Sequence, residues 1–153
     1  MNEPTDTDRA LKLWVVLARA HAAVAERVRA DLLRHGLTAA EFGVLEALYH
    51  KGPMLLGEVQ KKILVSSGGI TYLMDRLVTK GYTERRPCEE DRRASWAHLT
   101  PAGTALIENI FPGHAQMLQD TMAGLDEREK EQAIRLIRKL GLHAASELAE
   151  PAR

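Results

Sequence analysis

The sequence predicts a mainly α-helical protein with one small β-hairpin. Apolar residues recur every three or four positions along most of its 153 residues, which is the period of an amphipathic helix. The period changes to two only between residues 82 and 99, where the alternation indicates a pair of strands. A hydrophobic content of 45% supports one compact domain, residues 1–153.

The first predicted helix covers residues 8–35, and Gly36 supplies the left-handed residue that commonly closes a helix. At 1.5 Å per residue, a helix of this length spans about 40 Å, which is more than the thickness of a small domain. Part of its apolar stripe must therefore be buried against something outside its own globule. The stripe consists of Leu11, Trp14, Val15, Ala18, His21, Ala22, Ala25, Val28 and Leu32.

A capping box opens the second predicted helix. The Thr38 hydroxyl and the Glu41 carboxylate can each accept a hydrogen bond from a backbone N–H that has no partner within the helix. The helix ends at Lys51-Gly52-Pro53, because glycine and proline do not continue it.

Two short helices follow across a tight turn. The third predicted helix lies around residues 55–64, and a polar break at residues 65–68 separates it from the fourth. The fourth helix stops at Lys80-Gly81. Two short helices joined in this way predict a helix-turn-helix.

The hairpin and two more helices complete the chain. Residues 82–86 and 94–99 alternate, and residues 87–93 between them are charged and typical of a turn. Thr100-Pro101 places a hydroxyl cap and a proline at the start of the fifth helix, which has a predicted kink at Pro112-Gly113. A second cap, Asp126 with Glu129, opens the last helix.

This order of elements resembles the MarR family of small bacterial regulators over nearly the whole chain. The most specific stretch runs from Leu55 to Pro101, and the matching motifs are Ile70-Thr71, Asp75-Arg76-Leu77, Gly81, Asp91-Arg92-Arg93 and the exit Leu99-Thr100-Pro101-Ala102-Gly103. The resemblance implies a winged helix-turn-helix lobe at residues 38–100, flanked by dimerisation helices at residues 8–35 and 101–149. It implies a homodimeric transcriptional regulator, expected to be a repressor of pseudo-palindromic operators in double-stranded DNA.

The charge pattern agrees with a DNA partner. The formal net charge is zero, but residues 61–93 carry eight basic against five acidic side chains. A fourth helix that begins with small residues can approach the floor of the major groove, while lysines and arginines outside it contact phosphates. The predicted DNA-binding residues are Lys61, Lys62, Ser66, Ser67, Gly68, Gly69, Thr71, Tyr72, Arg76, Arg86, Asp91, Arg92 and Arg93, with Arg85 as a further phosphate contact.

By resemblance, Arg93 enters the minor groove and Asp91 orients it. The resemblance also implies that the terminal helices interleave with those of a second copy, through Leu11, Trp14, Val15, Ile137 and Leu140. Family members commonly bind small aromatic or phenolic acids between the dimer helices and the DNA-binding lobe. The pocket for such an effector would here be lined by Trp14, His21 and Phe42.

Two other interpretations stay open. Cys88 lies beside Arg85 and Arg86, so it could act as an oxidant or quinone sensor, although two acidic residues follow it. Alternatively, the chain could be a helical interaction module whose basic hairpin binds an acidic protein. The six histidines are scattered and no catalytic motif is present, so the sequence predicts no enzyme, cofactor or metal site.

The single cysteine, the absence of a secretory signal and the lack of any apolar run of roughly 20 residues predict a cytoplasmic protein without a membrane partner.

Overall fold

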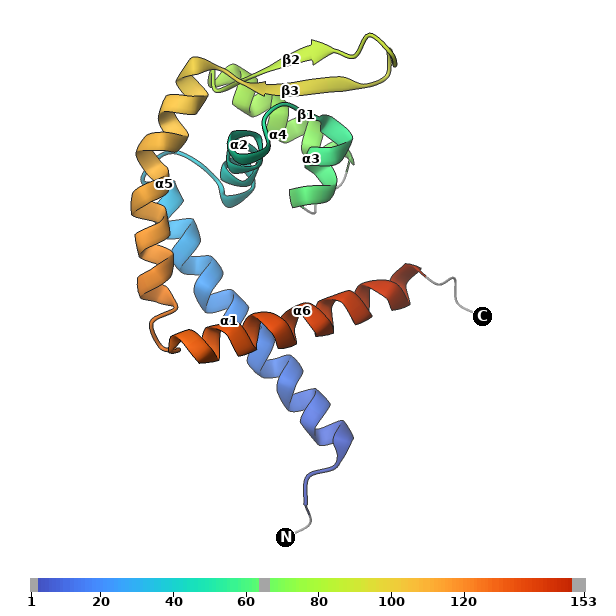
Figure 1. Cartoon of the computed structure of the whole chain (residues 1–153), viewed down its shortest axis with the longest axis vertical. Coiled ribbons are helices and arrows are strands. Elements are labelled where there is room, and N and C mark those ends of the chain that lie inside the picture. Colours follow the sequence, from blue (N-terminus) through green and yellow to red (C-terminus); the bar gives the residue numbers. More distant parts are fainter. Residues whose placement is uncertain (1–2, 64–66, 150–153) are drawn as a thin grey trace. The chain divides into compact units, whose positions relative to one another are not determined.

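The computed structural model describes residues 3–63 and 67–149 of the chain (Figure 1). Within this part, the mainly helical fold class with one small sheet is confirmed. The chain divides into two compact units, residues 1–118 and 119–153. The elements are α1 (Asp6–Leu33), α2 (Ala39–Lys51), β1 (Met54–Leu55), α3 (Leu56–Ile63), α4 (Ser67–Thr79), β2 (Thr83–Pro87), β3 (Ser95–Leu99), α5 (Pro101–Thr121) and α6 (Glu127–Ala149).

Hydrogen-bonded caps set where the helices begin. The predicted box at Thr38 and Glu41 is confirmed at the start of α2, as is the pair Asp126 and Glu129 before α6. A third box, formed by Thr5 and Asp8, was not predicted, and it starts α1 two residues earlier than the sequence pattern indicates. Each such cap stabilises a helix by roughly 1 kcal/mol, because it satisfies backbone donors that the helix leaves unpaired.

The predicted hairpin is part of a three-stranded antiparallel sheet with the order β1-β3-β2. Strands β2 and β3 pair from Thr83 with Leu99 to Pro87 with Ser95. The edge strand β1, in which Met54 pairs with Ala97, was not predicted. A strand of two residues is too short to show alternation, and it exists only because β3 offers a free edge.

The core of the first unit places α4 beneath the hairpin. The apolar side of α4 is buried, and the helix packs against α2, α3 and β2. Its outer side, with Thr71, Tyr72, Asp75 and Arg76, is exposed. Full burial of each large aliphatic side chain contributes about 1.5–3 kcal/mol, so the inner stripe fixes the orientation of the outer one. The fully buried core residues include Leu32, Val44, Leu45, Val59, Met74, Leu77, Ala97 and Ile107.

The second unit consists of the end of α5 and the helix α6. Helix α6 exposes a series of large aliphatic side chains, namely Ile134, Leu136, Ile137, Leu140 and Leu142. Within residues 3–63 and 67–149, none of the helices combines the length and the apolar character that crossing a bilayer requires.

Candidate nucleic-acid interface

Helix α4 is the second helix of the helix-turn-helix, and one of its sides is exposed. It begins at Ser67, and Ser66 lies outside the described residues. Gly68 is exposed at its first turn, Gly69 is half-buried, and Thr71 follows on the exposed side. Tyr72 is 61% exposed. A first turn without large side chains lets the backbone come close to a groove floor, while Thr71 and Tyr72 project from the next turn.

Arg76 lies on the same side of α4 but has partners within the protein. Its Nε donates to Oε1 of Glu41 on α2 over 2.8 Å. Its guanidinium carbon lies 5.7 Å from the centre of the Tyr72 ring, and its Nη1 lies 3.4 Å from the Tyr72 hydroxyl. The side chain nevertheless stays 43% exposed. The protein therefore orients Arg76, although a large part of the side chain stays accessible.

The Glu41 carboxylate is fully buried, and a second cation pairs with it. Lys80 donates from Nζ to Glu41 Oε2 over 2.9 Å and to the Gly36 carbonyl over 2.8 Å. Burial on its own raises the pKa of the Glu41 carboxyl, but the hydrogen bonds from Arg76, the Thr38 amide and Lys80 outweigh it. The pKa of Glu41 is therefore lowered from its ordinary value, and the carboxylate stays charged.

The β2–β3 hairpin carries two arginines at its tip. Asp91, Arg92 and Arg93 lie in the turn, and all three are exposed. The Asp91 carboxylate accepts a hydrogen bond from the backbone N–H of Arg93 over 2.9 Å, and the Asp91 carbonyl accepts one from Ala94. Asp91 thus fixes the backbone conformation of the turn that carries Arg93. A guanidinium on such a tip suits the narrow minor groove.

The two arginines of β2 are paired with neighbouring acids. Arg85 donates from Nη1 to Asp75 on α4 over 2.7 Å and from Nη2 to the Thr71 carbonyl over 3.1 Å. Arg86 donates from Nε to Glu84 over 2.9 Å. Arg85 therefore joins the hairpin to α4, a role that the sequence did not predict. The prediction of Arg86 as a phosphate contact stays a prediction.

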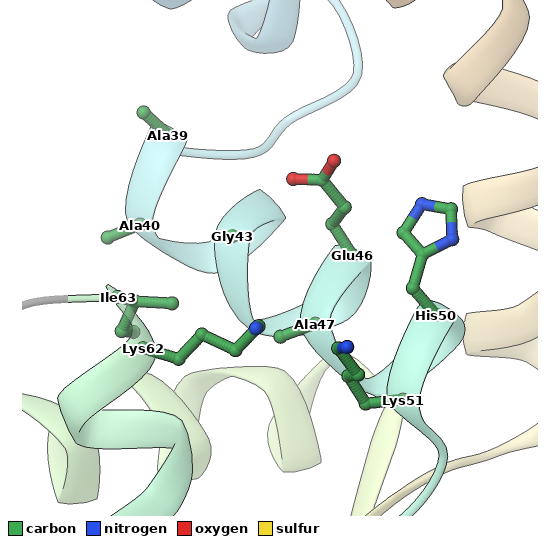
Figure 2. Close-up of a pocket in the computed structure, with 9 residues that line it drawn as sticks. All are labelled: Ala39, Ala40, Gly43, Glu46, Ala47, His50, Lys51, Lys62 and Ile63. Atoms are coloured by element: carbon green, nitrogen blue, oxygen red, sulfur yellow. The ribbon is translucent and has the colours of Figure 1, made fainter. Parts of the chain in front are cut away.

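Lys61 and Lys62 are exposed in the last turn of α3. Lys62 also lines an open groove of about 690 Å³ over α2, together with Lys51 and Ile63 (Figure 2). Small residues of α2 form the floor of this groove, and Glu46 and His50 complete its lining.

The three residues predicted for an effector pocket do not line this groove. Trp14 and His21 are exposed on α1. Phe42 is buried and packs against the His114 ring, with 4.6 Å between the ring centres. The Nδ1 of His114 lies 2.8 Å from the Asp31 carboxylate, so Phe42 borders a buried pair that the sequence did not reveal.

The residues predicted for a dimer interface are exposed within their own units. Trp14 is 66% exposed on α1, with Leu11 and Val15 on the same side of the helix. Ile137 and Leu140 are exposed on α6. Exposed apolar stripes of this kind mark a surface that a further chain can cover. Cys88 is half-buried beyond β2, where its backbone N–H donates to the Ala94 carbonyl.

A helix-turn-helix whose second helix exposes one side, followed by an antiparallel hairpin with arginines at its tip, defines a winged helix-turn-helix protein of the DNA-binding class. Residues 35–94 match the sequence model of the MarR family. The chain is 38% identical over 138 residues to the HTH-type transcriptional regulator MhqR of Bacillus subtilis strain 168, over 90% of this chain and 95% of MhqR. The chain belongs to the MarR family of transcriptional regulators.

Two solved structures resemble the fold closely. One shows the regulation of DNA binding of Bordetella bronchiseptica BpsR by 6-hydroxynicotinic acid, with 29% identity, a TM-score of 0.78 and coverage of 85% of this chain and 98% of BpsR. The other is a variant of MarR from E. coli complexed with operator DNA, with 26% identity, a TM-score of 0.80 and coverage of 90% of this chain and 99% of that one. The predicted resemblance is thereby confirmed.

Proposed function

We propose that this regulator binds pseudo-palindromic operators as a homodimer and represses transcription. The observation that carries the proposal is the joint exposure of the Thr71–Tyr72 side of α4 and of Arg92 and Arg93 at the hairpin tip. In this arrangement α4 enters the major groove, and the arginines at the hairpin tip contact the adjacent minor groove. The E. coli MarR variant that resembles the chain was solved with operator DNA, which supports the same partner here.

The two exposed apolar stripes support the homodimer part of the proposal. One helix-turn-helix contacts only a few base pairs, whereas two copies spaced about one DNA turn apart bind a repeated half-site together. The stripe on α1 and the one on α6 offer apolar surface for such pairing. A second copy would remove this surface from water and supply the second recognition helix.

Retention of genomic fragments on the purified protein tests this function. A specific regulator retains a small set of fragments that share an inverted repeat, and its affinity for them falls steeply with salt as counterions are released. A protein-interaction module with a basic hairpin would retain fragments without sequence preference, or none. Equal retention of all sequences at every salt concentration would contradict the proposal.

We further propose that a small aromatic acid releases the regulator from DNA and that it binds in the groove over α2. The groove is lined by small and aliphatic residues together with Glu46, His50, Lys51 and Lys62, and its two ammonium groups can pair with the carboxylate of a ligand. BpsR supports this class of ligand, because 6-hydroxynicotinic acid regulates the DNA binding of that protein.

Isothermal titration with 6-hydroxynicotinic acid as the probe tests the ligand site. Binding to the wild type that is weakened in Lys51→Met supports the groove, since Lys51 lies outside the predicted DNA-binding residues. Equal binding to both proteins would place the ligand elsewhere.

A further inference from the structure

Glu41 makes more contacts than a helix cap requires. As the third residue of α2, it accepts a hydrogen bond from the Thr38 amide over 2.9 Å, which completes the capping box. The same carboxylate also accepts from Arg76 and Lys80, which lie 35 and 39 residues further along the chain on and just beyond α4. Glu41 therefore joins the start of α2 to the outward helix.

The contact with Arg76 uses the inner edge of the guanidinium. The Nε faces Glu41, and the Nη1 lies near the Tyr72 hydroxyl. Because the guanidinium is planar and rigid, a fixed Nε sets the direction of all its other donors. Arg76 also lines a shallow hollow on α4, together with Tyr72, Asp75, Thr79 and Lys80.

The charges of this cluster favour an anionic partner. Two cations, Arg76 and Lys80, meet one buried carboxylate, so the cluster keeps a net positive charge. Lys80 donates hydrogen bonds to both oxygens of the Glu41 carboxylate. The carboxylate therefore keeps a partner even when other donors of Arg76 bind DNA. A buried carboxylate that lost both partners would be costly, which keeps the arrangement in place.

We propose that Glu41 is a positioning residue for DNA recognition. It holds Arg76 by the Nε atom, so that the side chain presents its Nη atoms from α4 to DNA in one orientation. Lys80 donates to both oxygens of the same carboxylate and also to the Gly36 carbonyl, which fixes the position of Glu41. The inference rests on the DNA-binding function proposed above.

The variant Glu41→Gln separates positioning from simple charge. Glutamine keeps the size of the side chain and can still accept from the Thr38 amide, as in other capping boxes. Removal of a negative charge near a polyanion would by itself strengthen DNA binding. Loss of a positioned arginine weakens it, and we expect affinity for a selected operator duplex to fall on the order of tenfold. The matched control is Glu26→Gln, since Glu26 also pairs with an arginine, Arg29, but at an exposed position of α1.

A double-mutant cycle assigns the effect to Arg76. In an Arg76→Ala background, Glu41→Gln should have no further effect on DNA affinity, because there is no guanidinium left to position. Arg76→Lys, which keeps the charge but not the planar fork, should lose preference for the operator over a random duplex. This second variant leaves Glu41 and its cap intact, so it also tests the inference if Glu41→Gln folds poorly.

The possible outcomes separate the inference from the function on which it rests. Unchanged or tighter operator binding by Glu41→Gln, an equal loss in the Arg76→Ala background, or full discrimination by Arg76→Lys would each overturn the positioning role alone. A wild-type protein that fails to prefer any duplex would contradict the proposed function, and the inference with it.

Discussion

The guanidinium of Arg85 on β2 lies 2.7 Å from the carboxylate of Asp75 on α4 and joins the hairpin to the outward helix. A second bond from Arg85 reaches the Thr71 carbonyl one helical turn before Asp75. The two elements proposed to enter adjacent grooves of DNA are thus connected by one side chain. Asp75 is 59% exposed and Arg85 33%.

Asp75→Asn should weaken operator binding while changing stability little. An exposed ion pair contributes at most about 1 kcal/mol to folding, so the melting temperature should fall by no more than ~4 °C. Removal of a negative charge beside DNA would strengthen binding if Asp75 were only a surface charge. We expect weaker binding, because the hairpin loses its fixed position relative to α4. Fluorescence anisotropy with a labelled operator measures the affinity, and tighter binding would contradict the role of the pair.

Leu11→Lys and Ile137→Lys should each shift the protein toward monomer. Both side chains are exposed within their units and belong to the stripes that a second copy is proposed to cover. Burying an unpaired ammonium in an apolar interface costs several kcal/mol, which is enough to separate a dimer of ordinary affinity.

Sedimentation equilibrium of these variants checks the interface. The control is Val78→Lys, which adds the same charge at an exposed aliphatic position on α4. It should stay dimeric. Dimers that persist in Leu11→Lys and Ile137→Lys would show that the copies meet through another surface.

Gly103→Ala should destabilise the first unit strongly. A methyl group at Gly103 would lie 2.0 Å from the Tyr82 carbonyl oxygen, a backbone atom that also accepts from the Thr100 amide. Relief of that clash must move backbone, at a cost of about 3 kcal/mol, the upper end for overpacking. Gly113, also in α5, has no atom within 4 Å of such a methyl group. Gly113→Ala should therefore be neutral or stabilise by up to about 1 kcal/mol. Equal melting temperatures for the two variants would contradict the close approach.

Acid should remove the contribution of Glu41 to stability. Because the folded state lowers the pKa of this carboxyl from its ordinary value of 4.5, the contribution is complete above that value and is lost as the pH falls through the folded pKa. The melting temperatures of wild type and Glu41→Gln should therefore differ at neutral pH and converge below about pH 4.5. A difference that stays constant down to pH 3 would contradict the lowered pKa.

The melting temperature of Glu41→Gln should still fall in acid. Burial alone raises the pKa of the Asp31 carboxyl, but its hydrogen bonds with His114 and Arg34 lower it overall. Asp31 therefore provides a second carboxyl whose contribution is lost in acid.

Local sequence signals predicted the secondary structure well. The box at Thr38 and Glu41, the proline at the start of α5 and the alternation in residues 82–99 each act over a few residues, and all three are present in the structure. Strand β1 was missed because its two residues carry no period of their own.

The contacts of the candidate site depend on packing between distant segments. Glu41 with Arg76, Arg85 with Asp75, and Asp31 with His114 pair across gaps of 10 to 83 residues. Nothing local distinguishes an arginine that will be paired from one that will face DNA. The sequence therefore indicated the segments of the candidate interface, but not that acidic side chains pair with Arg76 and Arg85.

Operator affinity of the wild type and of Arg93→Ala, measured on one retained duplex and on a scrambled duplex of equal length, tests the central claim most directly. We predict that the wild type binds the retained duplex as a dimer and at least about a hundredfold more tightly than the scrambled one. Arg93→Ala should lose several-fold in affinity while remaining dimeric. Equal affinity of the wild type for both duplexes, together with no effect of Arg93→Ala, would contradict a regulator that reads DNA with α4 and the hairpin tip.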